Sequence, residues 1–224
     1  MPAPLLDRTL SGMDELSHSI LHRAMELAAE RGWRRTGLAD VARAVPAPLG
    51  ELYRRFPTRA ALLAGVAELA DAAVLAGDIP LDESESARDR IFDVMMRRFD
   101  ALVPHRAGLA SVMRDLPREP LTALAFSGAY ARSMAWMLRA AGLDPDGPGG
   151  AALVAGLGAV HARVMRTFLK DDTADLARTM AALDAELRRA ESWANSLSPS
   201  RRRPQRGERP PPEAGKEPVD AATG

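Results

Sequence analysis

The chain has 224 residues, of which 46% are hydrophobic and 27% are charged, the balance of a globular protein. Its 30 Lys and Arg residues equal its 30 Asp and Glu residues, which excludes a uniformly basic nucleic-acid binder but leaves room for a local basic patch. The chain has no cysteine, which excludes disulfides, thiolate metal sites and cysteine nucleophiles. No apolar run approaches the ~20 residues of a transmembrane helix, and the N-terminus lacks the apolar segment of a secretory signal. We therefore expect a cytoplasmic protein without a membrane-spanning segment.

The residue pattern is helical almost throughout, because Ala, Leu, Arg, Glu and Met dominate and long β-branched runs are missing. Asp14 is a suitable N-cap for the first helix and Gly32 a suitable stop, while Thr58 is a suitable N-cap for the fourth helix. Pro46 and Pro48 separate the second helix from the third, since proline lacks the N–H donor that a helix interior needs. In chain order, the predicted helices cover residues 14–31, 37–45, 48–56, 58–76, 85–103, 105–115, 121–141, 150–170 and 172–196.

Three short helices followed by longer ones indicate an all-α protein of about nine helices. We predict a helix-turn-helix domain at residues 1–60 and a helical-bundle domain at 61–197 that binds a ligand and dimerises. The segment 198–224 is rich in Pro and Arg and has one large aliphatic residue, Val219. Such a segment cannot bury enough apolar area to offset its ordering entropy, so we predict a disordered tail.

The N-terminal segment resembles the DNA-binding domain of TetR-type transcriptional regulators over about 45 residues without a gap. The matching positions are Glu30-Arg31-Gly32-Trp33, Thr36, Val41-Ala42, Gly50, Leu52-Tyr53, Phe56-Pro57, Thr58-Arg59 and Leu62-Leu63. This resemblance implies a ligand-responsive regulator, with repression as the preferred direction, that binds double-stranded operator DNA as a homodimer. It also implies that Thr36, Tyr53 and Arg59 meet phosphates.

A short recognition helix that enters the major groove would place Leu49 and Arg54 within reach of bases. The predicted DNA-binding residues are Thr36, Leu49, Gly50, Glu51, Tyr53, Arg54, Arg55 and Arg59. The chain departs from the family pattern at four of its positions: Pro46 replaces the usual glycine of the turn, Pro48 the usual serine, Leu49 the usual cationic or polar residue, and Glu51 the usual threonine. Residues 1–60 carry nine Arg against seven Asp and Glu, a net charge of only +2.

The C-terminal part is loosely similar to a second group of proteins with this fold, the lipid-binding accessory proteins of ubiquinone biosynthesis. The similarity covers about 28 residues and consists of an apolar helix, an acidic break and an amphipathic helix. It rests on Phe168, Leu169, Asp171, Asp172, Asp175, Thr179, Leu183 and Asp184. The alternative function is therefore that of a lipid or isoprenoid carrier that does not bind DNA.

Two apolar stripes in the last two predicted helices indicate a homodimer interface. In the last helix the apolar positions follow 4,3,4,3 spacing over three heptads, and the helix before it adds small residues for close approach. The predicted interface residues are Leu153, Leu157, Val160, Val164, Leu176, Met180, Leu183 and Leu187. The same stripe would also serve packing inside one protomer, and both interpretations stay open.

The helical-bundle domain is rich in methionine and aromatic residues, which line adaptable apolar pockets well but also build ordinary helical cores. The predicted pocket residues are Met95, Phe99, Met113, Phe126, Tyr130, Met134 and Met137. No ionisable residue is assigned to this pocket, so we expect a small hydrophobic effector that is neutral or weakly anionic.

We find no phosphate loop and no nucleophile–base pair, and His18 and His22 are interpreted as solvated helix residues. We therefore expect no enzyme activity, no cofactor and no metal site.

Overall fold

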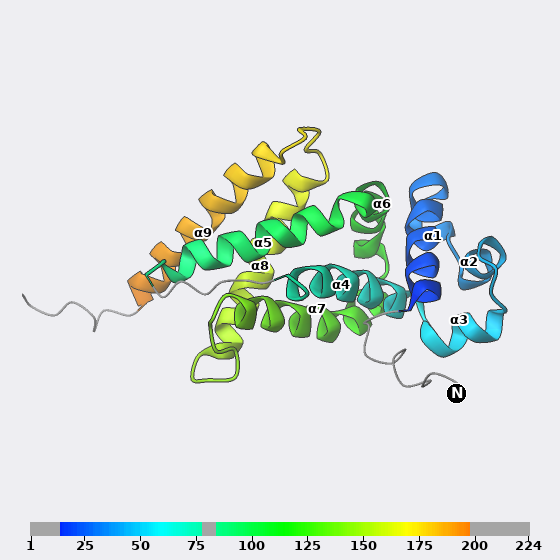
Figure 1. The fold of residues 1–224 in the computed structure, drawn as a ribbon, viewed down its shortest axis with the longest axis horizontal. Helices are drawn as coiled ribbons and strands as arrows, with labels where there is room; N and C mark the ends of the chain where they lie inside the picture. Colours follow the sequence, from blue (N-terminus) through cyan, green and yellow to red (C-terminus); the bar gives the residue numbers. More distant parts are fainter. Residues whose placement is uncertain (1–13, 78–83, 198–224) are drawn as a thin grey trace, which may run out of the picture.

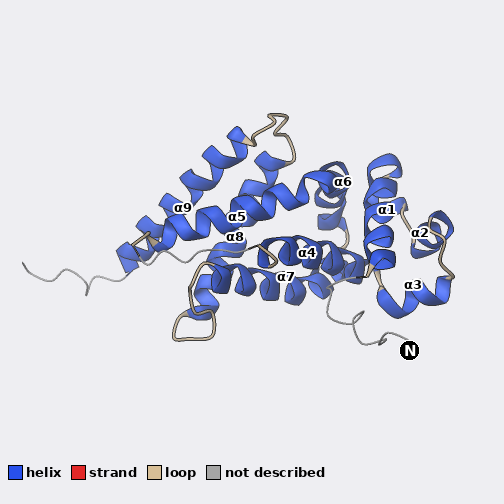
Figure 2. Cartoon of the chain, in the orientation of Figure 1, coloured by secondary structure: helices blue, strands red, loops and turns tan. Residues whose placement is uncertain are grey.

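The structure is a computed structural model that describes residues 14–77 and 84–197; the predicted tail lies outside these ranges. Within them the chain is all helical, as predicted, with nine α-helices, three short 3₁₀ turns and no strand (Figures 1 and 2). The α-helices are α1 (Glu15–Arg31), α2 (Leu38–Ala44), α3 (Leu49–Arg55), α4 (Arg59–Leu75), α5 (Ala87–Leu102), α6 (Arg106–Asp115), α7 (Pro120–Ala140), α8 (Gly150–Phe168) and α9 (Ala177–Leu197). The 3₁₀ turns are η1 (Trp33–Arg35), η2 (Val103–His105) and η3 (Leu116–Arg118).

The predicted helix caps are confirmed. The side chain of Asp14 accepts a hydrogen bond from the backbone N–H of Ser17 at 3.0 Å, which satisfies one of the free donors at the start of α1. At the other end of α1, Gly32 adopts φ 93°, a backbone conformation that side chains disfavour. Thr58 caps α4 in the same way as Asp14 caps α1, accepting from the N–H of Ala61 at 3.1 Å.

The turn between α2 and α3 accommodates two prolines without a left-handed residue. Val45 has φ −120° and Pro48 has φ −60°, and no residue of this turn has positive φ. The N–H of Ala47 donates to the carbonyl of Val45 at 2.8 Å, which closes the turn. The turn therefore needs no glycine at position 46.

The last helix begins at Ala177, five residues later than predicted, because Asp171 organises the residues before it. The carboxylate of Asp171 is buried and accepts hydrogen bonds from the backbone N–H and hydroxyl of both Thr173 and Thr179, at 2.6–3.2 Å. Leu176 has φ 54° and is the one non-glycine residue of the described ranges with positive φ. Arg106, the first residue of α6, donates to the carbonyl of Asp171 and so ties this loop to α6.

Helices α1–α3 lie at one end of the molecule and α4–α9 form the body (Figure 1). The most extensive helix contacts are those of α1 with α6, α4 with α7, and α8 with α9. The approach of α1 to α6 is close at Gly108, where a Cβ atom would meet the carbonyl oxygen of Met25 at 2.5 Å. The buried apolar side chains form one cluster that extends from α1 to α9. This cluster includes residues on both sides of the domain boundary predicted at residue 60. No helix in the described part of the chain is long and apolar enough to span a membrane.

Candidate nucleic-acid interface and ligand cavity

The third helix presents most of its side chains to solvent. Leu52 is fully buried and anchors α3 to the core, whereas Leu49 is 55% and Tyr53 66% exposed. Arg54 is also exposed, and a Cβ atom on Gly50 would meet nothing within 4 Å. Leu49 and Tyr53 are four positions apart on α3, so they share one exposed face that is available to contact another molecule.

The cationic side chains of α3 are paired with acids of the same chain. Arg54 forms an ion pair with Glu51, one turn earlier on α3. Arg55 lies 2.8 Å from the carboxylate of Asp14, at the start of α1, and 3.8 Å from Glu51. Arg54 is largely exposed, so its pair contributes little free energy and can be exchanged for a phosphate partner, whereas Arg55 is only 30% exposed.

Two predicted DNA-binding residues occupy the junction between α1–α3 and the body. Thr36 is buried, and its hydroxyl donates to the carbonyl of Gly32 at 3.1 Å. The guanidinium of Arg59 lies 2.9 Å from the carboxylate of Glu119 and 5.6 Å from the ring centroid of Trp33. In this conformation Thr36 stabilises the turn after α1, whereas Arg59, which also donates to the carbonyl of Trp33 at 3.3 Å, links the N-terminal unit to the body.

Helix α6 reinforces the same junction. The hydroxyl of Ser111 accepts from the backbone N–H of Trp33 at 2.8 Å, and the carboxylate of Asp115 accepts from the N–H of Arg34 at 3.2 Å. Trp33 itself is fully buried. Any displacement of α6 would thus act directly on the segment that connects α1 to α2.

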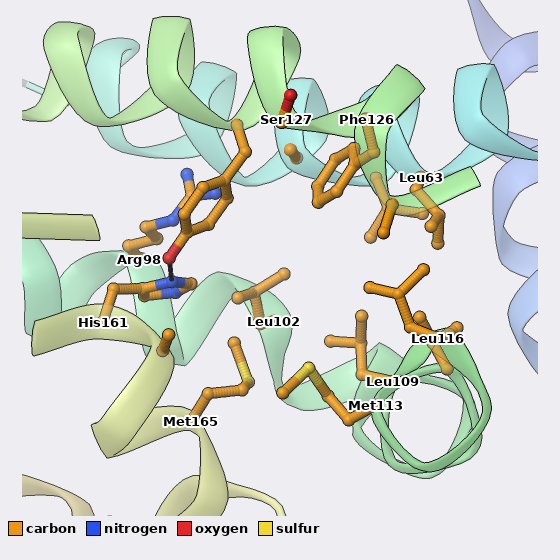
Figure 3. A pocket seen from close by; sticks show the side chains of 16 residues that line it. Leu63, Arg98, Leu102, Leu109, Met113, Leu116, Phe126, Ser127, His161 and Met165 are labelled. Atoms are coloured by element: carbon orange, nitrogen blue, oxygen red, sulfur yellow. Dashed lines mark hydrogen bonds between the residues drawn. The ribbon is translucent and has the colours of Figure 1, made fainter. Parts of the chain in front are cut away.

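A cavity of about 310 Å³ lies inside the body, and Figure 3 shows its lining. Of the predicted pocket residues, Met113, Phe126 and Tyr130 line it. Met95, Phe99, Met134 and Met137 do not line it, because they are buried in the core around it. The full lining comprises Leu63, Val66, Ala67, Arg98, Leu102, Leu109, Val112, Met113, Leu116, Ala123, Phe126, Ser127, Tyr130, His161, Ala162 and Met165.

A buried ion pair lies beside this cavity. Arg98, which lines the cavity and is 2% exposed, pairs with the carboxylate of Asp71 on α4. The same carboxylate oxygen accepts from the hydroxyl of Ser133 at 2.9 Å. Burial raises the pKa of Asp71, and the guanidinium of Arg98 opposes that rise. The positive charge of Arg98 is thus balanced by one carboxylate.

A tyrosine–histidine pair forms a second polar group of the lining. The hydroxyl of Tyr130 lies 2.8 Å from the carbonyl of Gly158 and 2.8 Å from Nδ1 of His161. The imidazole of His161 is 4% exposed and stacks on Phe99 at 5.3 Å between ring centroids. Burial lowers the pKa of His161 well below its usual value and raises that of Tyr130 to about 12. Both groups are therefore neutral at pH 7.

The predicted pocket lacked Arg98 and His161, although the sequence around Arg98 contains a signal for its burial. Arg98 follows Met95 by three positions and precedes Leu102 by four, so it lies on the apolar stripe of α5. A charged residue on such a stripe is buried with a partner or faces a cavity. His161 gave no comparable signal, because a single histidine in an Ala- and Gly-rich helix is equally compatible with solvent exposure.

The predicted dimer stripe lies mostly inside the protomer. Six of its eight residues are buried in the single chain: Leu157, Val160, Val164, Leu176, Leu183 and Leu187. Leu153 and Met180 remain 44% and 41% exposed. The 4,3 spacing of α9 therefore reflects its packing within one protomer, against α8 and α5.

Comparison with known proteins gives matches at two levels. The family model described as "Bacterial regulatory proteins, tetR family" matches residues 20–73, which span most of α1 through α4. A TetR transcriptional regulator from Nitrosomonas europaea ATCC 19718 superposes with a TM-score of 0.60 at 21% identity, covering 80% of this chain and 99% of that chain. A TetR transcriptional regulator from Rhodococcus sp. RHA1 gives 0.55 at 22% identity, covering 80% and 94%. No curated protein sequence matches the chain.

Proposed function

We propose that the protein is a ligand-responsive regulator that binds operator DNA as a homodimer, because the tetR family model matches residues 20–73 and the chain has the fold of TetR transcriptional regulators. The observation that carries the proposal is the exposed face of α3, where Leu49, Tyr53 and Arg54 stand free of the core. Repression is the preferred direction of regulation.

The exposed face of α3 supplies chemistry for reading a major groove, which is about 12 Å wide and admits one helix. Arg54 reaches a base edge or phosphate once it leaves Glu51, and the apolar side chain of Leu49 suits a thymine methyl group. Glu51, when released from Arg54, can accept a hydrogen bond from a cytosine amino group. The exposed phenol of Tyr53 would donate to a phosphate.

Dimerisation would use the outer faces of α8 and α9, because their inner faces are occupied within the protomer. The outer faces are built largely from small exposed residues, which allow helices to approach closely. On α8 and α9 these residues are Ala152, Ala155, Gly156, Ala159, Ala177, Ala181 and Ala185. A two-fold axis through this surface would present two α3 helices to half-sites about one helical turn, ~34 Å, apart.

An effector would control DNA binding by changing the position of α6, which contacts both the cavity and the N-terminal unit. Leu109, Val112 and Met113 line the cavity from this helix, and Leu116 from the turn that follows it. The same helix holds the α1–α2 connection through Ser111 and Asp115. An effector that binds one arrangement of α6 better than another therefore shifts the population between two placements of the DNA-binding domain.

The alternative, an isoprenoid carrier without DNA binding, is favoured by the apolar lining of the cavity but not by its size. An engineered cavity of about 150 Å³ holds one benzene. A cavity of about 310 Å³ thus accommodates a molecule of roughly two rings, which is too small for a long polyprenyl chain. Organic extraction of the purified protein followed by mass spectrometry distinguishes the two functions, since a co-purified polyprenyl lipid would support the carrier.

Selection of bound duplexes from a random DNA library tests the proposal. We expect an enriched palindromic site, and we expect Leu49→Ala to change the preferred bases because this side chain faces the groove. Ala29→Arg, a substitution at an exposed position of α1, serves as a folding control. A library that shows no enrichment over several rounds, with a folded dimeric protein, would refute the proposal.

A further inference from the structure

The chemistry of the cavity restricts its ligand more narrowly than an apolar lining alone. Leu102, Leu109, Leu116 and Met165 form an apolar region, whereas Arg98 and His161 lie together on another side (Figure 3). Both polar residues are more than nine-tenths buried. Arg98 Nε and His161 Nε2 have no hydrogen-bond partner among the described residues. A ligand with a matching polar group would satisfy these two atoms.

The hydrogen bonds around Tyr130 fix which histidine nitrogen carries the proton. The hydroxyl of Tyr130 has one hydrogen, and the carbonyl of Gly158 can only accept, so the hydroxyl donates to Gly158. The contact with His161 is then a hydrogen bond only if Nδ1–H donates to the tyrosine oxygen. Because the imidazole is neutral, Nε2 is left as a bare acceptor. Arg98 Nε–H is a donor, so these two unpartnered atoms are one acceptor and one donor.

The charge balance disfavours an anionic ligand. Asp71 already neutralises Arg98, and the neutral imidazole adds no positive charge. A ligand carboxylate would therefore bring a second buried negative charge close to Asp71 without a free counter-ion. No other charged residue lines the cavity.

From this geometry we propose that the effector is a compact, uncharged molecule of about two rings with a single hydroxyl group, which donates to His161 Nε2 and accepts from Arg98 Nε–H. A hydroxyl group supplies the donor and the acceptor from one atom. The apolar remainder fills the region between Leu102 and Leu116. This inference deepens the proposed function by naming the ligand class, and its effect on DNA rests on that function.

Calorimetric titration of the full chain with three matched probes tests the inference: naphthalene, 2-naphthol and 2-naphthoate. We expect 2-naphthol to bind about tenfold more tightly than naphthalene, the gain of one well-placed hydrogen-bonding group. We expect 2-naphthoate to bind more weakly than 2-naphthol. Equal affinity for naphthalene and 2-naphthol, tighter binding of 2-naphthoate, or no binding of any probe would overturn the inference.

The variant His161→Phe assigns the preference to the imidazole. It keeps an aromatic ring beside Phe99 and removes both nitrogens, so the tenfold ratio between the affinities for 2-naphthol and naphthalene should fall to about one. Nitrogen NMR of the histidine side chains of the unmodified protein gives a readout without ligand. It should show His161 protonated at Nδ1, and protonation at Nε2 would contradict the inference.

These titrations contain no DNA, so their result is separable from the proposed function. If 2-naphthol binds with the expected preference but the protein binds no duplex, the ligand class stands and the regulator function fails. If operator DNA binds but none of the probes does, the regulator function stands and the ligand class fails.

Discussion

The guanidinium of Arg59 lies 2.9 Å from the carboxylate of Glu119 and donates to the carbonyl of Trp33 at 3.3 Å, so it links the residue before α7 to the segment between α1 and α2. Arg59 is the first residue of α4, next to the turn that follows α3. Glu119 precedes α7 and follows Leu116, a cavity residue, by three positions. A change in the position of Leu116 would therefore shift Glu119 and its partner Arg59, which follows the end of α3 by four residues.

Replacement of Glu119 by glutamine should weaken this connection. The pair is only partly exposed, so we expect Glu119→Gln to lower the free energy of unfolding by about 1 kcal/mol. We also expect a smaller difference between the DNA affinities measured with and without effector. Urea unfolding and DNA titrations check the two parts. Glu68→Gln is the matched control, because the pair of Glu68 with Arg132 is exposed and 3.7 Å long, and its loss should cost less than about 0.5 kcal/mol.

The close approach of α1 to α6 gives a second prediction. In Gly108→Ala the new methyl group would overlap the backbone of Met25, so α6 has to move away from α1. We expect a loss of about 1–3 kcal/mol in stability and a reduced affinity for DNA even without effector. In Gly128→Ala the methyl group meets open space on α7, and we expect a slight gain in helix stability. If both variants behave alike in thermal unfolding and DNA binding, α6 does not couple the two regions.

The dimer surface is tested by substitutions on the two sides of α8 and α9. Ala159→Arg places a long cation on the outer face of α8, so we expect monomers with unchanged helix content in sedimentation velocity. Ala29→Arg, on α1, should leave the dimer intact. By contrast, Leu183→Ala removes a fully buried side chain of the protomer and should cost about 2–5 kcal/mol of stability. An Ala159→Arg protein that remains dimeric would exclude this face.

The Asp171 capping cluster predicts a specific pH dependence. Burial alone would raise the pKa of Asp171, but the hydrogen bonds from Thr173 and Thr179 outweigh it and hold the pKa well below its usual value. A carboxylate whose folded-state pKa is depressed stabilises the fold above its unfolded pKa, about 4, and loses this contribution as the pH falls further. Asp171→Asn should therefore cost about 1–3 kcal/mol at pH 7 and progressively less below pH ~4.

Urea unfolding at pH 7, 5 and 3 measures this dependence. Asp172→Asn is the control, since Asp172 is exposed and makes only a surface pair with Arg178. A stability difference for Asp171→Asn that does not shrink at low pH would contradict the interpretation.

Local signals in the sequence predicted the helices well. Asp14 and Thr58 cap their helices through side-chain hydrogen bonds to residues three positions away, so the information is contained in a short segment. The predicted start of α9 was wrong by five residues. The buried carboxylate of Asp171 accepts two hydrogen bonds from Thr179, eight residues away, and the helical spacing of apolar residues does not reveal this contact.

The candidate sites could be predicted only in part, because they depend on contacts distant in sequence. The spacing of Leu183 and Leu187 is identical for packing within a protomer and between protomers, and only the fold places them inside. The partners of Arg59 and Arg98 lie 60 and 27 positions away. Without these partners, Arg59 could not be distinguished from a phosphate ligand, nor Arg98 from a solvated residue.

The most direct test of the central claim is a fluorescence anisotropy titration of the protein with duplex DNA from upstream of its own gene, at 50 and 200 mM salt. We expect the affinity to fall at least about tenfold between the two salt concentrations, as phosphate contacts require. Tyr53→Ala and Arg54→Ala should each weaken binding several-fold. Arg139→Ala, which removes an arginine paired with Asp146 far from α3, should not change the affinity. Absence of binding at 50 mM salt, or equal affinities for all variants, would contradict the assignment of α3 as a DNA-reading helix.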